Sequence, residues 1–144
     1  MSYSERITWS QLIASTIGTA VYLVLVVPQL AHTPVGEIDW VWPMVWTILG
    51  AIVLSITISI LWGIAAGMLD PEAEHRADQR DREIEQFGDR IGQAFLVLGS
   101  LAGLVLAMVS ADWFWIGNAL FLGFFLSALL GGIARLVAYR RGFQ

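Results

Sequence analysis

The sequence contains no cysteine and no lysine, so all of its basic residues are arginines. Without cysteine, the chain can form no disulfide, thiol nucleophile or cysteine-based metal site. Without lysine, it cannot form the Schiff base by which retinal and pyridoxal phosphate are attached. The sequence also lacks the basic stripe that nucleic-acid binding uses. These absences exclude several enzyme classes and leave nucleic acid out of the expected partners.

Charged residues are scarce, at 14% of the chain against about 25% in soluble domains. Hydrophobic residues make up 57% and come in long uninterrupted blocks. A helix of about twenty apolar residues crosses a hydrocarbon core roughly 30 Å thick. The composition therefore predicts an all-α integral membrane protein, so the lipid bilayer is one of its expected partners.

Four apolar segments have the length of a transmembrane helix: 7–27, 41–68, 90–109 and 114–137. The first is interpreted as a helix rather than a signal peptide, because no basic cluster precedes it and no small-residue cleavage site follows it. The helices are predicted to form two similarly oriented hairpins, 7–68 and 90–137, within a single membrane domain, 1–144. Between them, the polar stretch 70–91 is predicted to be a helix that extends the third span into the cytoplasm.

Arginine placement predicts the orientation of these helices. The arginines fall near the N-terminus, in the polar stretch and near the C-terminus, which four spans place on one side of the membrane. The charged residues on the other side are Glu37, Asp39 and Asp112. By the positive-inside rule, both termini and the polar stretch are cytoplasmic.

A short internal repeat links the two predicted hairpins. Asp39–Trp42 (DWVW) opens the second helix, Asp112–Trp115 (DWFW) opens the fourth, and the same offset places Gly50 over Gly123. The match indicates two hairpins related by a pseudo-two-fold axis along the membrane normal. The alternative is that an interfacial helix start favours an acid and a tryptophan in any case.

Small residues recur along the helices, mostly at four-residue intervals. The clearest rows are Ala51, Ser55, Ser59, Gly63 and Gly67 on the second helix, Gly88, Gly92, Gly99, Gly103 and Ala107 on the third, and Ala119, Gly123, Ser127 and Gly131 on the fourth. In lipid no hydrophobic effect drives helices together, so close backbone approach through small residues supplies the attraction. The rows predict a compact four-helix bundle and self-association through any row left over.

The polar stretch 70–91 holds most of the acidic residues and half of the arginines. Asp70 and Pro71 are typical of a helix start, as N-cap and first helical residue. Salt-bridge spacings recur along the predicted helix, which favours an exposed charged face. We predict that this face docks a cytoplasmic protein, and the candidate residues are Asp78, Arg82, Glu85 and Asp89.

The same stretch contains residues that could bind a metal ion. Its acidic row is Glu74, Asp78, Asp81 and Glu85, with His75 one turn before Asp78. Carboxylates and an imidazole can hold a divalent cation. However, a single helix cannot surround a metal, and an arginine interrupts the row. The sequence predicts no metal and no cofactor.

A second candidate site lies at the predicted outer ends of the helices. Its residues are Trp40, Trp42, Trp46, Trp113, Trp115 and Asn118. Tryptophans at such a mouth can form an aromatic cage for a ligand. The simpler interpretation is the belt of tryptophans that membrane proteins place at the lipid headgroups.

Four motifs spread over most of the chain carry a family resemblance. They are Asp78–Ile84 (DQRDREI), Gly88–Gln93 (GDRIGQ), Asp112–Asn118 (DWFWIGN) and Ala138–Phe143 (AYRRGF). With them the chain resembles a family of small four-helix membrane proteins of actinobacteria. In that family the first motif is often DERDREI, and here Gln79 replaces the glutamate. The resemblance implies a location in the plasma membrane and brings no activity or catalytic residue with it.

Two functions fit these observations. The sequence shows no nucleophile–base pair, phosphate-binding loop or metal-ligand set, so we do not expect an enzyme. The first function is an interaction, regulatory or sensor protein whose acidic cytoplasmic helix docks a partner. The second is an oligomeric channel or small-molecule transporter with a tryptophan-rich outer mouth. No Asp, Glu, Lys or His lies in the middle of a span, which argues against proton or sodium coupling.

Overall fold

The computed structural model describes residues 3–69 and 79–141, and within these ranges the chain is helical with no strand. Four long helices and two short 3-10 turns follow one another along the sequence. They are α1 (Tyr3–Val26), η1 (Val27–Ala31), η2 (Val35–Glu37), α2 (Val41–Leu69), α3 (Gln79–Met108) and α4 (Trp113–Arg141). Each of the four long helices is long and apolar enough to cross a membrane, in agreement with the four apolar segments predicted from the sequence.

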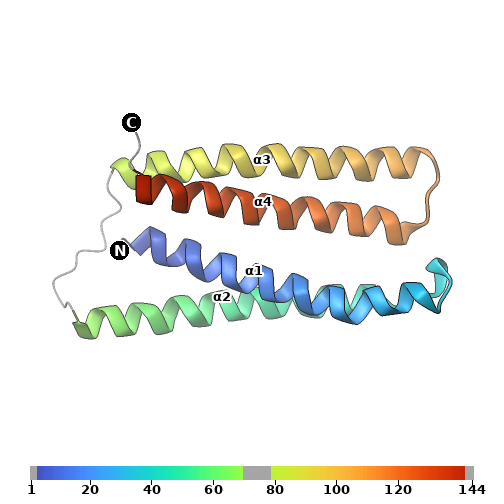
Figure 1. The fold of residues 1–144 in the computed structure, drawn as a ribbon, viewed down its shortest axis with the longest axis horizontal. Helices are drawn as coiled ribbons and strands as arrows, with labels where there is room; N and C mark the ends of the chain where they lie inside the picture. Colours follow the sequence, from blue (N-terminus) through green and yellow to red (C-terminus); the bar gives the residue numbers. More distant parts are fainter. Residues whose placement is uncertain (1–2, 70–78, 142–144) are drawn as a thin grey trace.

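The helices lie side by side in one bundle (Figure 1). Helices α1 and α3 run in one direction, and α2 and α4 run in the other. The most extensive packing is between α3 and α4, followed by α1 with α2, and α1 with α4 joins the two pairs. Helix α1 begins and α4 ends at the same end of the bundle.

The helix limits differ from the predicted spans mainly at this end of the bundle. Helix α1 begins at Tyr3 rather than near residue 7, and α4 continues to Arg141 rather than ending near 137. Hydropathy marks where a helix leaves the apolar phase, whereas hydrogen bonding continues into polar residues. Helix α3 runs unbroken from Gln79 to Met108, so the predicted continuation of the polar helix into the third span is confirmed for its described part. The predicted helix start at Asp70 lies outside the described residues.

The connection between α3 and α4 is closed by local hydrogen bonds. Ser110 adopts a left-handed backbone conformation, with φ 55°. The Ala111 amide donates to the Leu106 carbonyl at 2.9 Å, and the Ser110 amide donates to Ala107 at 3.1 Å, which is the Schellman pattern of a helix end. Asp112 then caps α4, because its Oδ1 accepts from the Phe114 amide at 2.9 Å.

Glycines set the distance between α3 and α4. Gly99 and Gly123 lie back to back, and a methyl group at Gly92 would stand 2.9 Å from the Ser127 carbonyl oxygen. These pairs come from the predicted small-residue rows, which therefore do form the interface of these two helices. In contrast, Gly63 and Gly67 in the row of α2 have no atom of the described residues within 4 Å of where a Cβ would stand.

An aromatic core fills the end of the bundle that holds the α3–α4 connection. Tyr22, Val26, Ile38, Trp40 and Phe114 are all buried there, and they come from α1, α4 and the loop before α2. The Trp40 and Phe114 rings meet edge to face, with centroids 6.1 Å apart. This end of the bundle is therefore closed by side chains.

The opposite half of the bundle is packed less symmetrically. If the two hairpins of the internal repeat were packed with two-fold symmetry, α2 would pack on α3 as α1 packs on α4. Within the described residues α2 packs extensively on α1 alone. The side of α2 that a symmetric bundle would cover therefore faces a gap, and a cavity lies in this gap.

Candidate functional site

The cavity beside α2 has a volume of about 650 Å³ and is lined by all four long helices. Cavities of roughly 300–1,000 Å³ are the usual size of small-molecule sites. It begins at the end of the bundle where α1 begins and α4 ends, extends past the middle of the helices, and is partly open to the outside. Among its lining residues, Thr8 and Thr19 mark its extent along α1. At 1.5 Å per helical residue this is about 17 Å, close to half of a hydrocarbon core.

The cavity changes character along its length. At the end near the start of α1, its walls include Thr8, Gln11, Asp89, Gln93 and Arg135. Further along, the walls are mostly apolar, with Ile48, Ile52, Phe121, Phe124 and Phe125 among them. Hydroxyl groups on the walls bond to their own helices: Thr47 Oγ1 donates to the Pro43 carbonyl at 2.8 Å, and Ser15 Oγ donates to Leu12 at 3.2 Å. The cavity is thus polar at one end and mainly apolar at the other.

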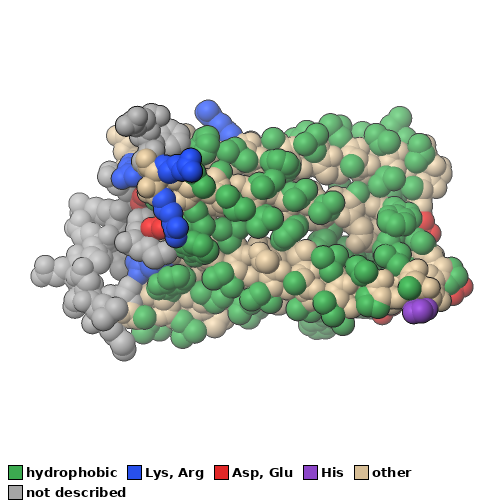
Figure 2. All heavy atoms as spheres, viewed as in Figure 1, with side chains coloured by type: hydrophobic (Ala, Val, Ile, Leu, Met, Phe, Trp, Pro, Cys, Tyr) green, Lys and Arg blue, Asp and Glu red, His purple; other side chains and the backbone are tan. Residues whose placement is uncertain are grey.

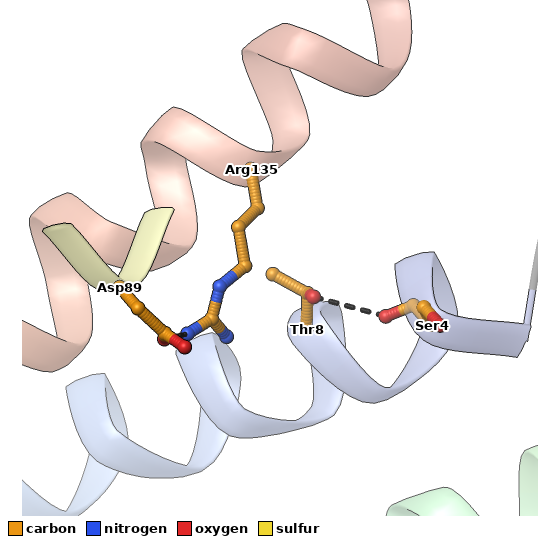
Figure 3. Close-up of polar contacts among 4 residues, drawn as sticks. All are labelled: Ser4, Thr8, Asp89 and Arg135. Carbon is orange, nitrogen blue, oxygen red and sulfur yellow. Dashed lines mark hydrogen bonds and ion pairs between the residues drawn. The ribbon is translucent and has the colours of Figure 1, made fainter. Parts of the chain in front are cut away.

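An ion pair stands at the polar end. The Nη2 of Arg135 on α4 contacts the Oδ1 of Asp89 on α3. Figure 3 shows the Arg135 side chain reaching from α4 towards Asp89, with Thr8 of α1 beside it. The side chain of Arg135 is 22% exposed and that of Asp89 is 57% exposed. The pair therefore has a half-buried cationic partner and a more exposed acidic partner.

Gly88 makes room for this ion pair. A Cβ at this position would collide with the Cγ and Nε of Arg135 and would stand 2.8 Å from the Gly131 carbonyl oxygen. The Nε of Arg135 is buried and has no hydrogen-bond partner among the described residues. A buried N–H without a partner costs free energy, so an acceptor that reached this group would stabilise the structure.

Sequence reasoning missed the ion pair. It assigned Asp89 to the docking face and counted Arg135 only among the arginines near the C-terminus. The signal was nonetheless present, because Asp89 begins the third apolar segment and Arg135 ends the fourth. Two neighbouring antiparallel helices place such positions at the same level, and Gly88 leaves the space between them.

The predicted docking residues lie in different surroundings. Asp78 lies outside the described residues, whereas Arg82 and Glu85 are exposed on the first turns of α3. Ile84, between them, is fully buried, so this turn of α3 packs against the bundle with its charged side outwards. Asp89 belongs to the cavity. Among the described residues, no group of three His, Asp or Glu side chains is placed to hold a metal ion.

The six residues of the predicted outer aromatic site are divided among several surroundings. Trp40 is buried, with Gly117 directly against its ring and Trp113 edge to face at 5.7 Å between centroids. Trp42 and Trp46 are exposed and line a smaller apolar groove between α1 and α2. The rings of Trp113 and Trp115 are also largely exposed.

Asn118 is engaged inside the bundle rather than at an outer site. Its Oδ1 accepts a hydrogen bond from the Tyr22 hydroxyl at 2.6 Å, which ties α4 to α1. Its Nδ2 donates to the Phe114 carbonyl at 2.8 Å. Both ends of the amide therefore have partners, and we assign this residue to helix association.

No protein-family model matches the chain, and no curated protein or solved structure matches it either. The function is therefore inferred from the geometry of the cavity and from the distribution of charge.

Proposed function

We propose that this chain is a small multi-pass protein of the plasma membrane that acts as a sensor or regulatory module and not as an enzyme. Its cavity binds an amphipathic molecule of the membrane. The acidic start of α3, together with the stretch before it, docks a cytoplasmic protein. The observation that carries the proposal is the ion pair of Asp89 and Arg135, which places a residue of the polar α3 segment directly in the cavity wall.

The charge distribution supports a membrane orientation with both termini in the cytoplasm. Figure 2 shows the arginines gathered at one end of the molecule and hydrophobic side chains around the rest of its length. Arginine-rich ends stay on the cytoplasmic side. In that orientation the cavity opens into the inner leaflet, with its polar end at the headgroups.

Helix α3 connects the cavity directly to the proposed docking face. Arg82 and Glu85 lie on the same unbroken helix as Asp89, within two turns of it. A ligand that binds Arg135 breaks its ion pair with Asp89. The start of α3 is then no longer held to α4 by this ion pair, and its position relative to α4 changes. Two alternative pairings of one side chain are the kind of two-state element on which switching depends.

A channel or transporter is the second candidate, favoured by the polar lining near the cavity mouth. The aromatic core around Tyr22, Trp40 and Phe114 fills the opposite end of the bundle. Conduction through one chain therefore requires that core to open. Self-association through a small-residue row is also part of the proposal, and the open row of α2 at Gly63 and Gly67 is available for it.

The test is retention of membrane lipid by the purified full-length protein in native mass spectrometry. We expect the wild type to carry a lipid adduct and Ser55→Trp to lose it, because Ser55 lines the cavity. Ser59→Trp is the matched control, since it lies one turn along the same row of α2 outside the cavity lining. Equal retention by both variants contradicts the cavity as the binding site. Solute flux in liposomes that Ser55→Trp blocks would favour the channel instead.

A further inference from the structure

We infer that the polar end of the cavity is a headgroup site for a zwitterionic phospholipid with a primary ammonium, one of whose acyl chains lies in the cavity. The inference rests on the proposed function, because it names the ligand of the same cavity. Three observations carry it: the charges at the mouth, the burial of each charge, and the depth of the cavity.

The charges at the mouth complement a zwitterion. Asp89 and Arg135 are the charged residues of the cavity lining, one of each sign. A headgroup with a phosphate and an ammonium carries one charge of each sign as well. Its phosphate binds the Arg135 guanidinium in place of Asp89, and its ammonium binds the Asp89 carboxylate. Each ion then keeps a charge-assisted hydrogen bond, and the site remains neutral. A purely anionic headgroup would leave Asp89 without a cation and place two negative charges side by side.

The burial of the two residues matches the order of groups in such a lipid. Phosphate is attached to the glycerol that carries the acyl chains, and the ammonium lies further out towards water. Arg135 is the more buried residue and Asp89 the more exposed. The unpartnered Nε of Arg135 supplies a further donor for a phosphate oxygen. Arginine offers several N–H donors in a fixed fork, which suits phosphate.

The depth and polarity of the cavity match one acyl chain. Its extent from Thr8 to Thr19 is about 17 Å, roughly one leaflet of the hydrocarbon core. Its far walls are mainly isoleucine and phenylalanine side chains. The open side, where α2 and α3 lack extensive packing, leaves a lateral route from the bilayer and space for the second chain outside.

The experiment is native mass spectrometry of the full-length protein with three lipids of identical acyl chains added in equal amounts. The lipids are phosphatidylethanolamine, phosphatidylcholine and phosphatidylglycerol. We expect phosphatidylethanolamine to be retained about tenfold more than either of the others, the effect of one charge-assisted hydrogen bond. Phosphatidylcholine lacks the N–H donors that the Asp89 carboxylate accepts, and phosphatidylglycerol lacks the cation. Equal retention of all three overturns the inference.

Two variants separate the groups. Asp89→Asn is expected to remove the preference for phosphatidylethanolamine while binding persists, and Arg135→Gln is expected to weaken retention of every phospholipid. Glu85→Gln is the matched control, one turn away on the exposed side of α3 and outside the cavity lining. A preference that survives Asp89→Asn overturns the inference.

The possible instability of Arg135→Gln is controlled by Arg135→Lys, which keeps the charge and is expected to recover part of the retention. The two proposals fail in different ways. If lipid is held in the cavity without headgroup preference, only the headgroup site is wrong. If Ser55→Trp leaves lipid retention unchanged, the cavity itself is not the binding site.

Discussion

Gly99 and Gly123 lie back to back between α3 and α4, with so little space that a methyl group at Gly123 would stand 2.7 Å from the Gly99 Cα. We expect Gly123→Ala to lower the free energy of unfolding by about 1–3 kcal/mol, the usual effect of overpacking. The measurement is the unfolding midpoint in detergent. Gly63→Ala is the control, because open space surrounds that position and alanine is the better helix former by up to about 1 kcal/mol. Equal effects of the two changes would show that α3 and α4 do not approach so closely.

Ser110 carries the positive φ that closes the end of α3. A left-handed conformation costs a residue with a side chain roughly 1–2 kcal/mol, whereas glycine adopts it freely. Glycine also gains freedom in the unfolded chain, so we expect Ser110→Gly to stabilise the protein by no more than about 1 kcal/mol. Thermal unfolding measures the change, and Ser100→Gly within α3 should be destabilising in the same assay. A loss of stability in Ser110→Gly would contradict the Schellman ending.

The hydrogen bond from Tyr22 to Asn118 is the polar contact by which α1 holds α4 in the aromatic core. Hydrogen bonds between membrane helices contribute on average about 0.6 kcal/mol, with values up to about 1.7. We expect Tyr22→Phe to cost an amount in this range. A double-mutant cycle with Asn118→Ala isolates the bond, because in the absence of one partner the second change should cost less. Strictly additive losses would mean that the hydroxyl and the amide act independently.

At the scale of elements, α2 and α3 are the two outer helices, because within the described residues α2 packs extensively on α1 alone and α3 on α4 alone. Helix α2 comes close to α1 at Gly18, where a Cβ would stand 3.0 Å from the Ala51 Cβ. Cβ atoms of a disulfide are about 3.5–4.5 Å apart, so a small shift accommodates the bond. We expect the double variant Gly18→Cys/Ala51→Cys to form an intramolecular disulfide under mild oxidation.

The native chain has no cysteine, so a gel-mobility shift reports this crosslink without background. Gly18→Cys/Gly63→Cys is the control pair, because Gly63 has no neighbour within 4 Å. An equally efficient crosslink in the control would mean that α2 slides along α1, and the gap beside α2 would then not be a fixed cavity.

The helices also show how far sequence patterns reach at this scale. The four spans and the small-residue rows of α3 and α4 follow from hydropathy and spacing, and the structure contains them at the predicted places. The row of α2 is equally regular, yet only Ala51 within it meets a glycine of α1. Spacing identifies which face of a helix can pack closely, whereas the partner of that face depends on the arrangement of the whole bundle.

For the whole molecule, the proposed orientation places the η1–η2 loop outside the cell and the arginine-rich end inside. Single cysteines test this without interference from native thiols. We expect His32→Cys to react with a membrane-impermeant maleimide in intact cells, because His32 is exposed in that loop. Arg82→Cys, exposed at the start of α3, should react only after the membrane is opened. The reverse labelling pattern would invert the topology and place the cavity in the outer leaflet.

The sequence by itself determined the number, length and apolar character of the helices, because each of these is a property of one segment. It also located the arginines near both termini and in the polar stretch. Only the tertiary structure decided that α1 packs on α4 while α2 stands away from α3, because this depends on how four helices share a limited set of faces. The cavity and the pairing of Asp89 with Arg135 follow from that arrangement. These two residues are distant in the chain and meet only because α3 and α4 run side by side at the separation their glycines allow.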